Sequence, residues 1–178
     1  MAQQYKRLKR ELVSKGAIID YYHDIMEIPN GKTATWDFID HKGAAAVVAV
    51  KPDGKLVMVR QYRNALERDT IEIPAGGLNP GESMKEAAIR ELKEETGFET
   101  DEVEFLLSIR TTVAFCNERI DIFLAKNLTP GEQNPDEDEY VEIEEYTLEE
   151  LVEMINRGVI QDSKTVSAIL CYYAKIMK

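Results

Sequence analysis

The sequence predicts an α/β or α+β sandwich built around one central helix, and three observations support this. Short segments with the apolar or alternating pattern of strands lie on both sides of a helical segment at 83–96. Two further helical segments follow the last predicted strand. No repeat or long linker divides the 178 residues, which therefore fit one domain with a small extension.

Composition and charge exclude several classes of protein. Hydrophobic residues make up 44%, no apolar run approaches the roughly 18 residues of a membrane helix, and residues 1–15 lack the apolar segment of a signal peptide. Cys116 and Cys171 form neither a disulfide framework nor a metal-binding pattern, so we expect a reducing cytoplasm and no membrane partner. The net charge of −11 argues against nucleic acid as a partner, but metal ions could bridge the acids to a small phosphorylated substrate.

The first 41 residues are predicted to form an extension that stands apart from the rest. Residues 5–13 are basic and compatible with a short helix, whereas 17–27 and 32–40 are predicted strands of a hairpin turning at 29–31. The hairpin carries the aromatic residues Tyr21, Tyr22, Trp36 and Phe38. These rings either pack internally or, where partly exposed, form a subunit contact or a base-stacking surface.

Residues 42–178 are predicted to form the main domain. Its predicted strands are 44–50, 55–63, 71–73, 103–110, 119–126 and 140–146. The first is a continuous apolar run, as in a buried strand, and a turn at 52–54 joins it to the second in a hairpin. Segments 64–70 and 128–138 are predicted loops, the latter because it combines two Pro, one Gly and several acids.

The predicted helices have clear start and stop signals. The helix at 83–96 follows a Gly/Pro/Asn-rich turn, begins at Ser83 and stops at Gly97. The two C-terminal helices are 147–157, with a capping-box pattern from Thr147 to Glu150, and 164–177, capped by Asp162 or Ser163.

The central helix has acids on an unusual side. At about 100° per residue, Glu91 and Glu95 fall within the apolar stripe that contains Leu92, and Glu94 falls on its edge. An ordinary charge run would be a solvated acidic face. Carboxylates crowded on a buried face repel one another, and a hard divalent cation with oxygen ligands removes both the repulsion and the desolvation cost.

This stretch resembles the Nudix box, and every fixed position of that pattern is filled. The matching positions are Gly76, Glu82, Arg90-Glu91-Leu92, Glu94-Glu95 and Gly97-Phe98. The resemblance implies an α/β/α Nudix sandwich with a mixed sheet at 42–178 and a small antiparallel β-hairpin extension at 1–41.

The residues of the helix suggest their own chemistry. Glu91, Glu94 and Glu95 offer ligands for one to three Mg²⁺ ions, or Mn²⁺, which would clamp a phosphoryl group and polarise water for hydrolysis of a phosphoanhydride. The resemblance implies the Ala75 carbonyl as a further ligand and Glu82 beside the metal cluster. Arg90 falls away from the metal side of the helix on the helical wheel, so among the site residues we expect it to hold the loop by ion pairing.

The catalytic base is expected outside the helix, because the helix acids serve as ligands. The acid-rich loop at 136–139 is the candidate, and in Nudix hydrolases similar to ADP-ribose pyrophosphatases a glutamate of such a loop is the base. We assign Glu137 first and Glu139 second, with Glu139 also a candidate metal contact. The alternative is a solvated acidic turn.

The resemblance to ADP-ribose pyrophosphatases extends along nearly the whole chain, through segments 29–50, 59–63 and 71–82. It implies that Arg63 contacts phosphate or ribose, that Glu72 contacts substrate or metal-bound water, and that Trp36 stacks on adenine. It also implies a homodimer that exchanges the hairpin. Arg63 could instead be a surface charge at the end of a strand.

The expected function is Mg²⁺-dependent hydrolysis of ADP-ribose to AMP and ribose 5-phosphate. One segment departs from the resemblance, since Val113 and Ala114 stand where a proline-containing motif is usual. Other nucleoside diphosphate sugars or dinucleotides are therefore alternative substrates. A nucleotide sensor without activity, or a metal-binding scaffold, would be a different class of protein.

Overall fold

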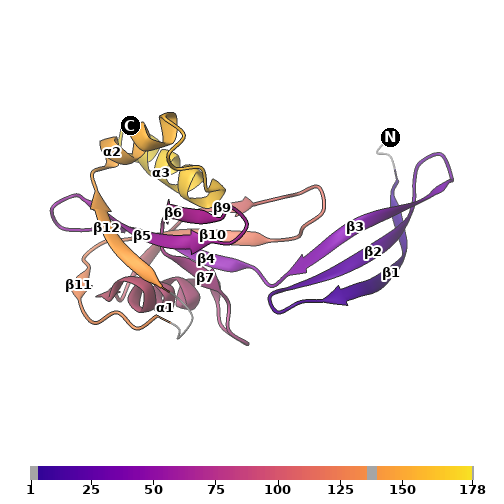
Figure 1. Cartoon of the computed structure of the whole chain (residues 1–178), viewed down its shortest axis with the longest axis horizontal. Coiled ribbons are helices and arrows are strands. Elements are labelled where there is room, and N and C mark those ends of the chain that lie inside the picture. Colours follow the sequence, from indigo (N-terminus) through magenta and orange to yellow (C-terminus); the bar gives the residue numbers. More distant parts are fainter. Residues whose placement is uncertain (1–3, 136–139, 178) are drawn as a thin grey trace. The chain divides into compact units, whose positions relative to one another are not determined.

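The computed structural model describes residues 4–135 and 140–177, which form two compact units (Figure 1). The first unit contains the described chain up to Gly43 together with Arg110–Arg119. The second contains Ala44–Ile109 and the described chain from Ile120 onward. The segment 110–119 joins the first unit because Ile39 exchanges backbone hydrogen bonds with Phe115 and Asn117, at 2.7 and 3.3 Å.

The first unit is an antiparallel sheet of strands β1 (Lys6–Lys15), β2 (Ile19–Glu27) and β3 (Thr33–His41). The predicted hairpin is confirmed, and Gly31 supplies the positive φ of 78° at its turn. The helical interpretation of residues 5–13 was wrong. Strand β1 pairs with β2 from Lys6 to Lys15, with two register shifts, so pairing with a neighbouring strand overrode the helix-compatible local composition.

The second unit is organised by a mixed sheet, which confirms the predicted class. Within the described residues seven strands belong to it, and five of them run in the order β12-β5-β4-β10-β9 while β6 pairs with β5 and β7 with β4. The bounds of the seven are β4 (Ala44–Val50), β5 (Leu56–Arg63), β6 (Arg68–Glu72), β7 (Ala75–Gly77), β9 (Val103–Arg110), β10 (Arg119–Ala125) and β12 (Val141–Tyr146). Strands β4 and β10 are parallel, whereas β4–β5 and β5–β12 are antiparallel.

Four short strands were not predicted correctly. Strand β6 begins at Arg68, inside a predicted loop, and β7 occupies the predicted turn before the helix. In the predicted loop after residue 127, β11 (Thr129–Pro130) pairs with β8 (Phe98–Glu99). Each of these strands exists only because a partner strand lies beside it, and residues this few carry no periodicity that a sequence could show.

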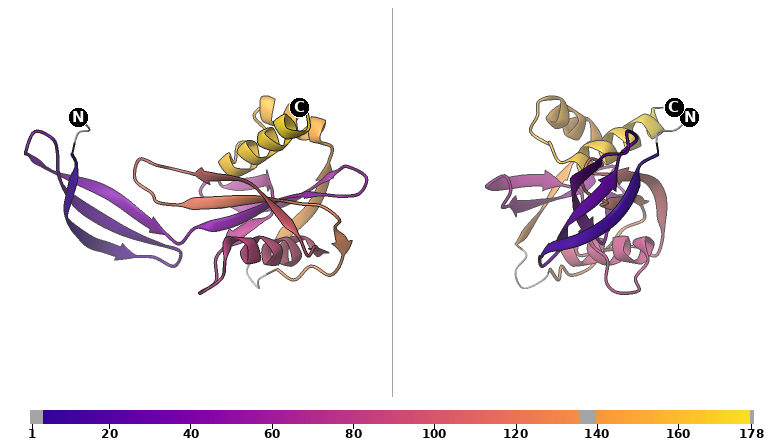
Figure 2. Two further views of the ribbon diagram at one scale, coloured as in Figure 1. Left: turned by 180° about the vertical axis from the view of Figure 1, so that it is seen from behind. Right: turned by 90° about the vertical axis from the view of Figure 1, so that its right-hand side faces the viewer.

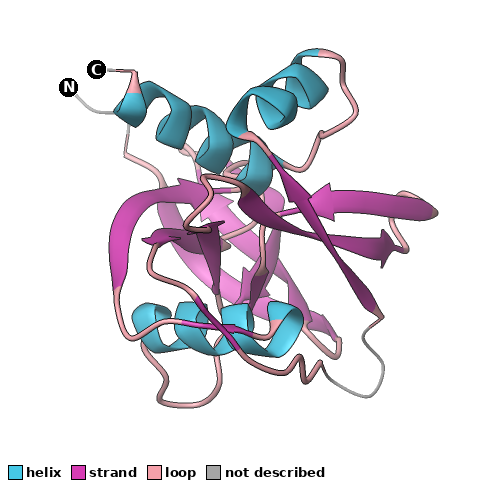
Figure 3. Cartoon of the chain, turned by 90° about the vertical axis from the view of Figure 1, so that its left-hand side faces the viewer, coloured by secondary structure: helices cyan, strands magenta, loops and turns pink. Residues whose placement is uncertain are grey.

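Helices cover both faces of the mixed sheet, as Figures 2 and 3 show. Helix α1 (Met84–Thr96) packs on one face, and α2 (Leu148–Asn156) and α3 (Ser163–Ile176) pack on the other. Alternate residues of β4 serve the two sides: Ala45 and Val47 belong to the core under α1, whereas Val48 belongs to the core under α2 and α3. This explains why the segment is apolar throughout.

The predicted helix caps are confirmed. Ser83 and Thr147 each accept a hydrogen bond from the backbone three residues later in a capping box, and Asp162 caps α3. No helix in the described part of the chain combines the length and the apolar character needed to cross a membrane.

Gly97 ends α1 in a crowded left-handed conformation, which gives a test of the fold. Its φ is 70°, and a Cβ there would lie 2.8 Å from the backbone nitrogen of Gln133. We expect Gly97→Ala to cost more than the roughly 1–2 kcal/mol of left-handed strain alone. Gly54→Ala is the matched control, because Gly54 has φ 86° and open space around it. Urea unfolding measures both, and an equal loss in the two variants would contradict the role of the close contact.

Candidate functional site

The site is built on the buried face of α1. Glu91 and Glu95 are only 8% and 2% exposed, and they share this face with Ala87, Ala88 and Leu92. The predicted placement of both acids on the apolar side is therefore confirmed. Glu94 lies at the edge, with 35% of its side chain exposed.

Strand β7 fixes both buried acids. The backbone N–H of Ala75 donates to Oε2 of Glu95 at 2.9 Å. The carboxylate of Glu91 occupies the space beside Gly76, where a Cβ would lie 2.1 Å from its Oε1. A side chain at position 76 would displace this carboxylate, so the glycine is required by the acid and not by its own backbone conformation.

Arg90 lies among the acids, and the expectation that it lies away from the metal side of the helix was wrong. Its guanidinium donates to Glu82 at 2.8 and 2.9 Å, as expected for holding the loop. It also donates to Oε1 of Glu91 at 2.7 Å and to Oε2 of Glu94 at 2.8 Å. The long side chain reaches back over its own helix, which the angle of its Cα does not show.

Charge pairing explains the shifted ionisation of this cluster. The hydrogen bonds from Arg90 to Glu82, and then those to Glu94 and Glu91, raise the pKa of Arg90 above its ordinary value. The same bond to Arg90, helped by the backbone N–H of Asn79, lowers the pKa of Glu82. Three carboxylates, those of Glu82, Glu91 and Glu94, thus surround one guanidinium. Glu95 lies on the buried face of the same helix, and all four carboxylates are oxygen donors.

The donor chemistry of this cluster fits a hard divalent cation. Carboxylate and carbonyl oxygens are the ligands that Mg²⁺ takes in proteins, and the buried carboxylates of Glu91 and Glu95 are already held in place. Among residues 4–135 and 140–177, however, no group of three or more His, Cys, Asp or Glu side chains is arranged to hold a metal ion. The assignment of Ala75, Glu82, Glu91, Glu94 and Glu95 as metal ligands therefore stays a prediction.

A second ionic cluster is centred on Glu72, which is 2% exposed at the end of β6. Nε and Nη2 of Arg63 donate to its two oxygens at 2.8 and 2.7 Å, and the hydroxyl of Thr70 donates at 2.5 Å. Nζ of Lys164, at the start of α3, also contacts Glu72. The structure thus brings the predicted residues Arg63 and Glu72 together, and Arg63 is not an isolated surface charge.

Lys164 was missed by the sequence analysis. It was treated as the first residue of the last helix, although one signal was available. A lysine in the first turn of a helix lies at the positive end of the helix dipole, where acidic residues are preferred. The side chain is 10% exposed and contacts both Glu72 and Asp162.

The remaining predicted residues lie elsewhere. Trp36 is on β3 of the first unit, where it is 45% exposed with its ring centroid 5.6 Å from that of Tyr5. Adenine stacking by Trp36 stays a prediction. The predicted bases Glu137 and Glu139 lie outside the described residues.

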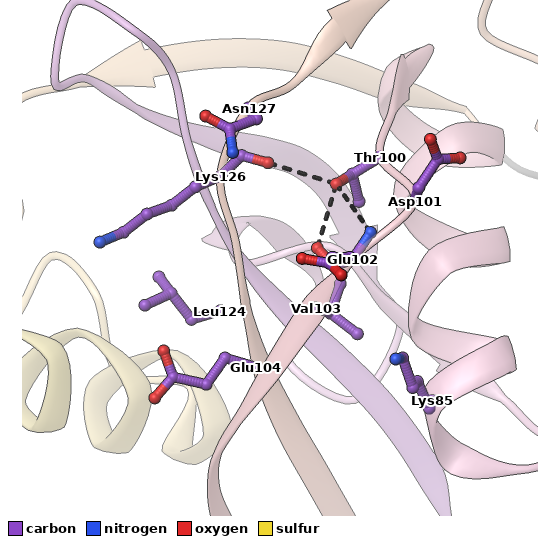
Figure 4. Close-up of a pocket in the computed structure, with 9 residues that line it drawn as sticks. All are labelled: Lys85, Thr100, Asp101, Glu102, Val103, Glu104, Leu124, Lys126 and Asn127. Atoms are coloured by element: carbon purple, nitrogen blue, oxygen red, sulfur yellow. Dashed lines mark hydrogen bonds between the residues drawn. The ribbon is translucent and has the colours of Figure 1, made fainter.

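A large cavity in the second unit does not contain the predicted site. Its volume is about 780 Å³, and its lining includes Lys85, Thr100, Glu102, Glu104 and Lys126, as Figure 4 shows. The hydroxyl of Thr100 donates to the carbonyls of Glu102 and Lys126 at 3.0 and 3.2 Å. None of the predicted site residues belongs to its lining.

Comparisons with known proteins agree with this fold. A family model described as NUDIX domain matches residues 40–168. A methanol dehydrogenase activator from Bacillus methanolicus is 42% identical, and an ADP-ribose pyrophosphatase from Bacillus subtilis is 40% identical. Each alignment covers 92% of this chain and 90% of the relative. A crystal structure of an ADP compounds hydrolase matches with a TM-score of 0.86 at 25% identity, covering 98% of this chain and 95% of that one.

The Glu72 cluster predicts a loss of stability in acid. Burial raises the pKa of Glu72, but hydrogen bonds from Arg63, Lys164 and Thr70 outweigh it and lower the pKa from 4.5 to about 2. A lowered pKa stabilises the folded state above pH ~4.5, and this contribution of about 3 kcal/mol is lost as pH falls toward 2. Urea unfolding between pH 7 and pH 2.5 should therefore show a shallower pH dependence in Glu72→Gln. Identical pH profiles for the two proteins would contradict the assignment.

Proposed function

Because the chain belongs to the NUDIX family, we propose that it is a Nudix hydrolase that cleaves the pyrophosphate bond of ADP-ribose to give AMP and ribose 5-phosphate. One observation supports the proposal above all others. Glu91 and Glu95, two buried glutamates of α1, lie directly against the backbone of residues 75 and 76. A buried pair of acids held in this way suits a cation that an anionic diphosphate can share. The relative from Bacillus subtilis supports the choice of ADP-ribose.

We assign each residue of the two clusters a role in this reaction. Mg²⁺, or Mn²⁺, in one to three copies would be held by Glu91, Glu94 and Glu95, with Glu82 and the Ala75 carbonyl beside them. When bound, these ions neutralise phosphate charge and polarise the attacking water. Arg90 holds the acids and the preceding loop together through its ion pairs.

Substrate binding and proton transfer fall to other residues. Arg63 binds the diphosphate or ribose, Glu72 contacts the substrate or metal-bound water, and Trp36 stacks on the adenine. The exposed face of Trp36 leaves its ring accessible to such a base. Glu137, or Glu139 as the second choice, removes a proton from the attacking water.

A broader substrate range is the second candidate. Val113 and Ala114 replace the motif usual in ADP-ribose pyrophosphatases, and Val113 is 80% exposed. The similar solved structure is of a protein described as acting on ADP compounds. A panel of ADP-ribose, other nucleoside diphosphate sugars and dinucleotides separates the two candidates, because a specific enzyme would prefer ADP-ribose over all the others.

We also propose a cytoplasmic homodimer. The free thiols of Cys116 and Cys171 suit a reducing compartment. The N-terminal sheet exposes the apolar side chains of Leu8, Leu12 and Trp36 by 47%, 54% and 45%, which is typical of a surface covered by a partner. Sedimentation equilibrium tests the dimer, and a monomer at micromolar concentration would contradict it.

Glu95→Gln tests the role of the buried acids. The amide keeps the size of the side chain but loses the charge, so we expect ADP-ribose hydrolysis with Mg²⁺ to fall by about 100-fold or more. Chromatography of the AMP formed measures the rate. Glu86→Gln is the matched control, because Glu86 lies exposed on the same helix and glutamine is also accepted in a capping box. Wild-type hydrolysis by Glu95→Gln would refute the mechanism.

Gly76→Ala tests whether activity depends on the position of the Glu91 carboxylate when the stability of the fold is unchanged. The three atoms nearest to the new methyl group all belong to the flexible end of the Glu91 side chain, at 2.1–2.5 Å, so this carboxylate should move while the fold persists. We expect a fall in kcat on the order of 100-fold with little change in Tm. Gly77→Ala is the control, because a Cβ there has no atom within 4 Å. Equal rates in the two variants would show that the position of the Glu91 carboxylate does not affect hydrolysis.

A further inference from the structure

Two cationic side chains converge on the single buried carboxylate of Glu72. Arg63 comes from the end of β5 and binds both oxygens of Glu72, and Lys164 comes from the first turn of α3. The side chain of Glu72 is 3% exposed. One cation would already neutralise this charge, so the second calls for an explanation.

The two cations differ in exposure and in how they are held. The side chain of Arg63 is 39% exposed, whereas that of Lys164 is 10% exposed. Lys164 is also tied to Asp162 at 3.0 Å, and Asp162 is itself fixed as the N-cap of α3 by the backbone N–H of Thr165 at 2.9 Å. Lys164 is therefore the fixed partner of Glu72, and Arg63 is the partner that can reach solvent.

Arg63 also interacts electrostatically with neighbouring acids. Its hydrogen bonds to Glu72 raise the pKa of Arg63, and the charges of Glu95 and Asp162 act in the same direction. The second cluster thus lies within electrostatic reach of the acids of α1, where the proposed function places the diphosphate.

We propose that Lys164 is a positioning residue that keeps Glu72 neutralised while Arg63 leaves it to bind the diphosphate of the substrate. The proposal rests on the proposed function. Removing the only partner of a buried charge is strongly unfavourable, because the charge is left uncompensated. With Lys164 in place, Glu72 keeps a cation when Arg63 moves, and the exchange carries little of that penalty.

A double-mutant cycle on the unliganded protein tests whether the two cations substitute for one another. Urea unfolding would be measured for wild type, Arg63→Gln, Lys164→Met and the double variant. We expect each single variant to fold with a modest decrease in the urea midpoint, and the double variant to lose much more than the two decreases combined. Additive losses would overturn the proposal. An unfolded Lys164→Met single variant would also overturn it, because Arg63 alone would then be insufficient for Glu72.

A binding experiment tests the exchange itself. Calorimetry with ADP-ribose in EDTA reports affinity without turnover. We expect Lys164→Met to weaken binding roughly tenfold, because Arg63 is then retained by Glu72, and Lys164→Arg to restore it. In steady state, KM should rise while kcat stays near wild type. In the Arg63→Gln background, Lys164→Met should weaken binding no further, and an equal effect in both backgrounds would overturn the proposal.

The control is Lys175→Met on the same helix. Lys175 pairs with Glu104 on the surface, at 2.5 Å, so its loss should change neither affinity nor KM.

Failure of the proposed function is recognised separately. A wild-type protein that neither binds nor cleaves ADP-ribose would refute the function, whereas the unfolding cycle, which needs no ligand, still decides whether Lys164 and Arg63 are interchangeable partners of Glu72.

Discussion

The contact between α1 and the short strand β7 is the constraint on which the site depends. A backbone N–H of residue 75 holds Glu95, and the absence of a side chain at residue 76 makes room for Glu91. Strand β7 is in turn paired with β4, the strand buried on both faces at the centre of the sheet. Two carboxylates are thereby fixed to the buried centre of the second unit, and attachment to regular elements of the fold favours precise positioning of ligands.

The two ionic clusters have an excess of opposite charge. In the first, several carboxylates share the guanidinium of Arg90, an arrangement that favours the approach of a further cation. In the second, a guanidinium and an ammonium share the carboxylate of Glu72, an arrangement that favours an anion. The proposed substrate, a diphosphate bound together with a divalent cation, carries both kinds of charge.

Helix α3 connects the second cluster to the first. The backbone N–H of Ile73 donates to the hydroxyl of Thr165 at 3.0 Å, and that hydroxyl donates to Asp162 at 2.6 Å. The start of α3 therefore fixes the chain between Glu72 and β7. A helix far along the sequence thus helps to position the segment that leads into the acids of α1.

The sequence by itself determined the central elements of the fold and the side of α1 on which its acids lie. The apolar run of β4, the capped helix α1 and the inward placement of Glu91 and Glu95 all follow from local patterns, because periodicity and caps are properties of neighbouring residues. Only the tertiary structure decided that residues 6–15 form a strand, that Arg90 reaches the acids beside it, and that Lys164 meets Glu72. These depend on partners brought close by folding, 92 residues apart in the last case, and no local pattern specifies such a contact.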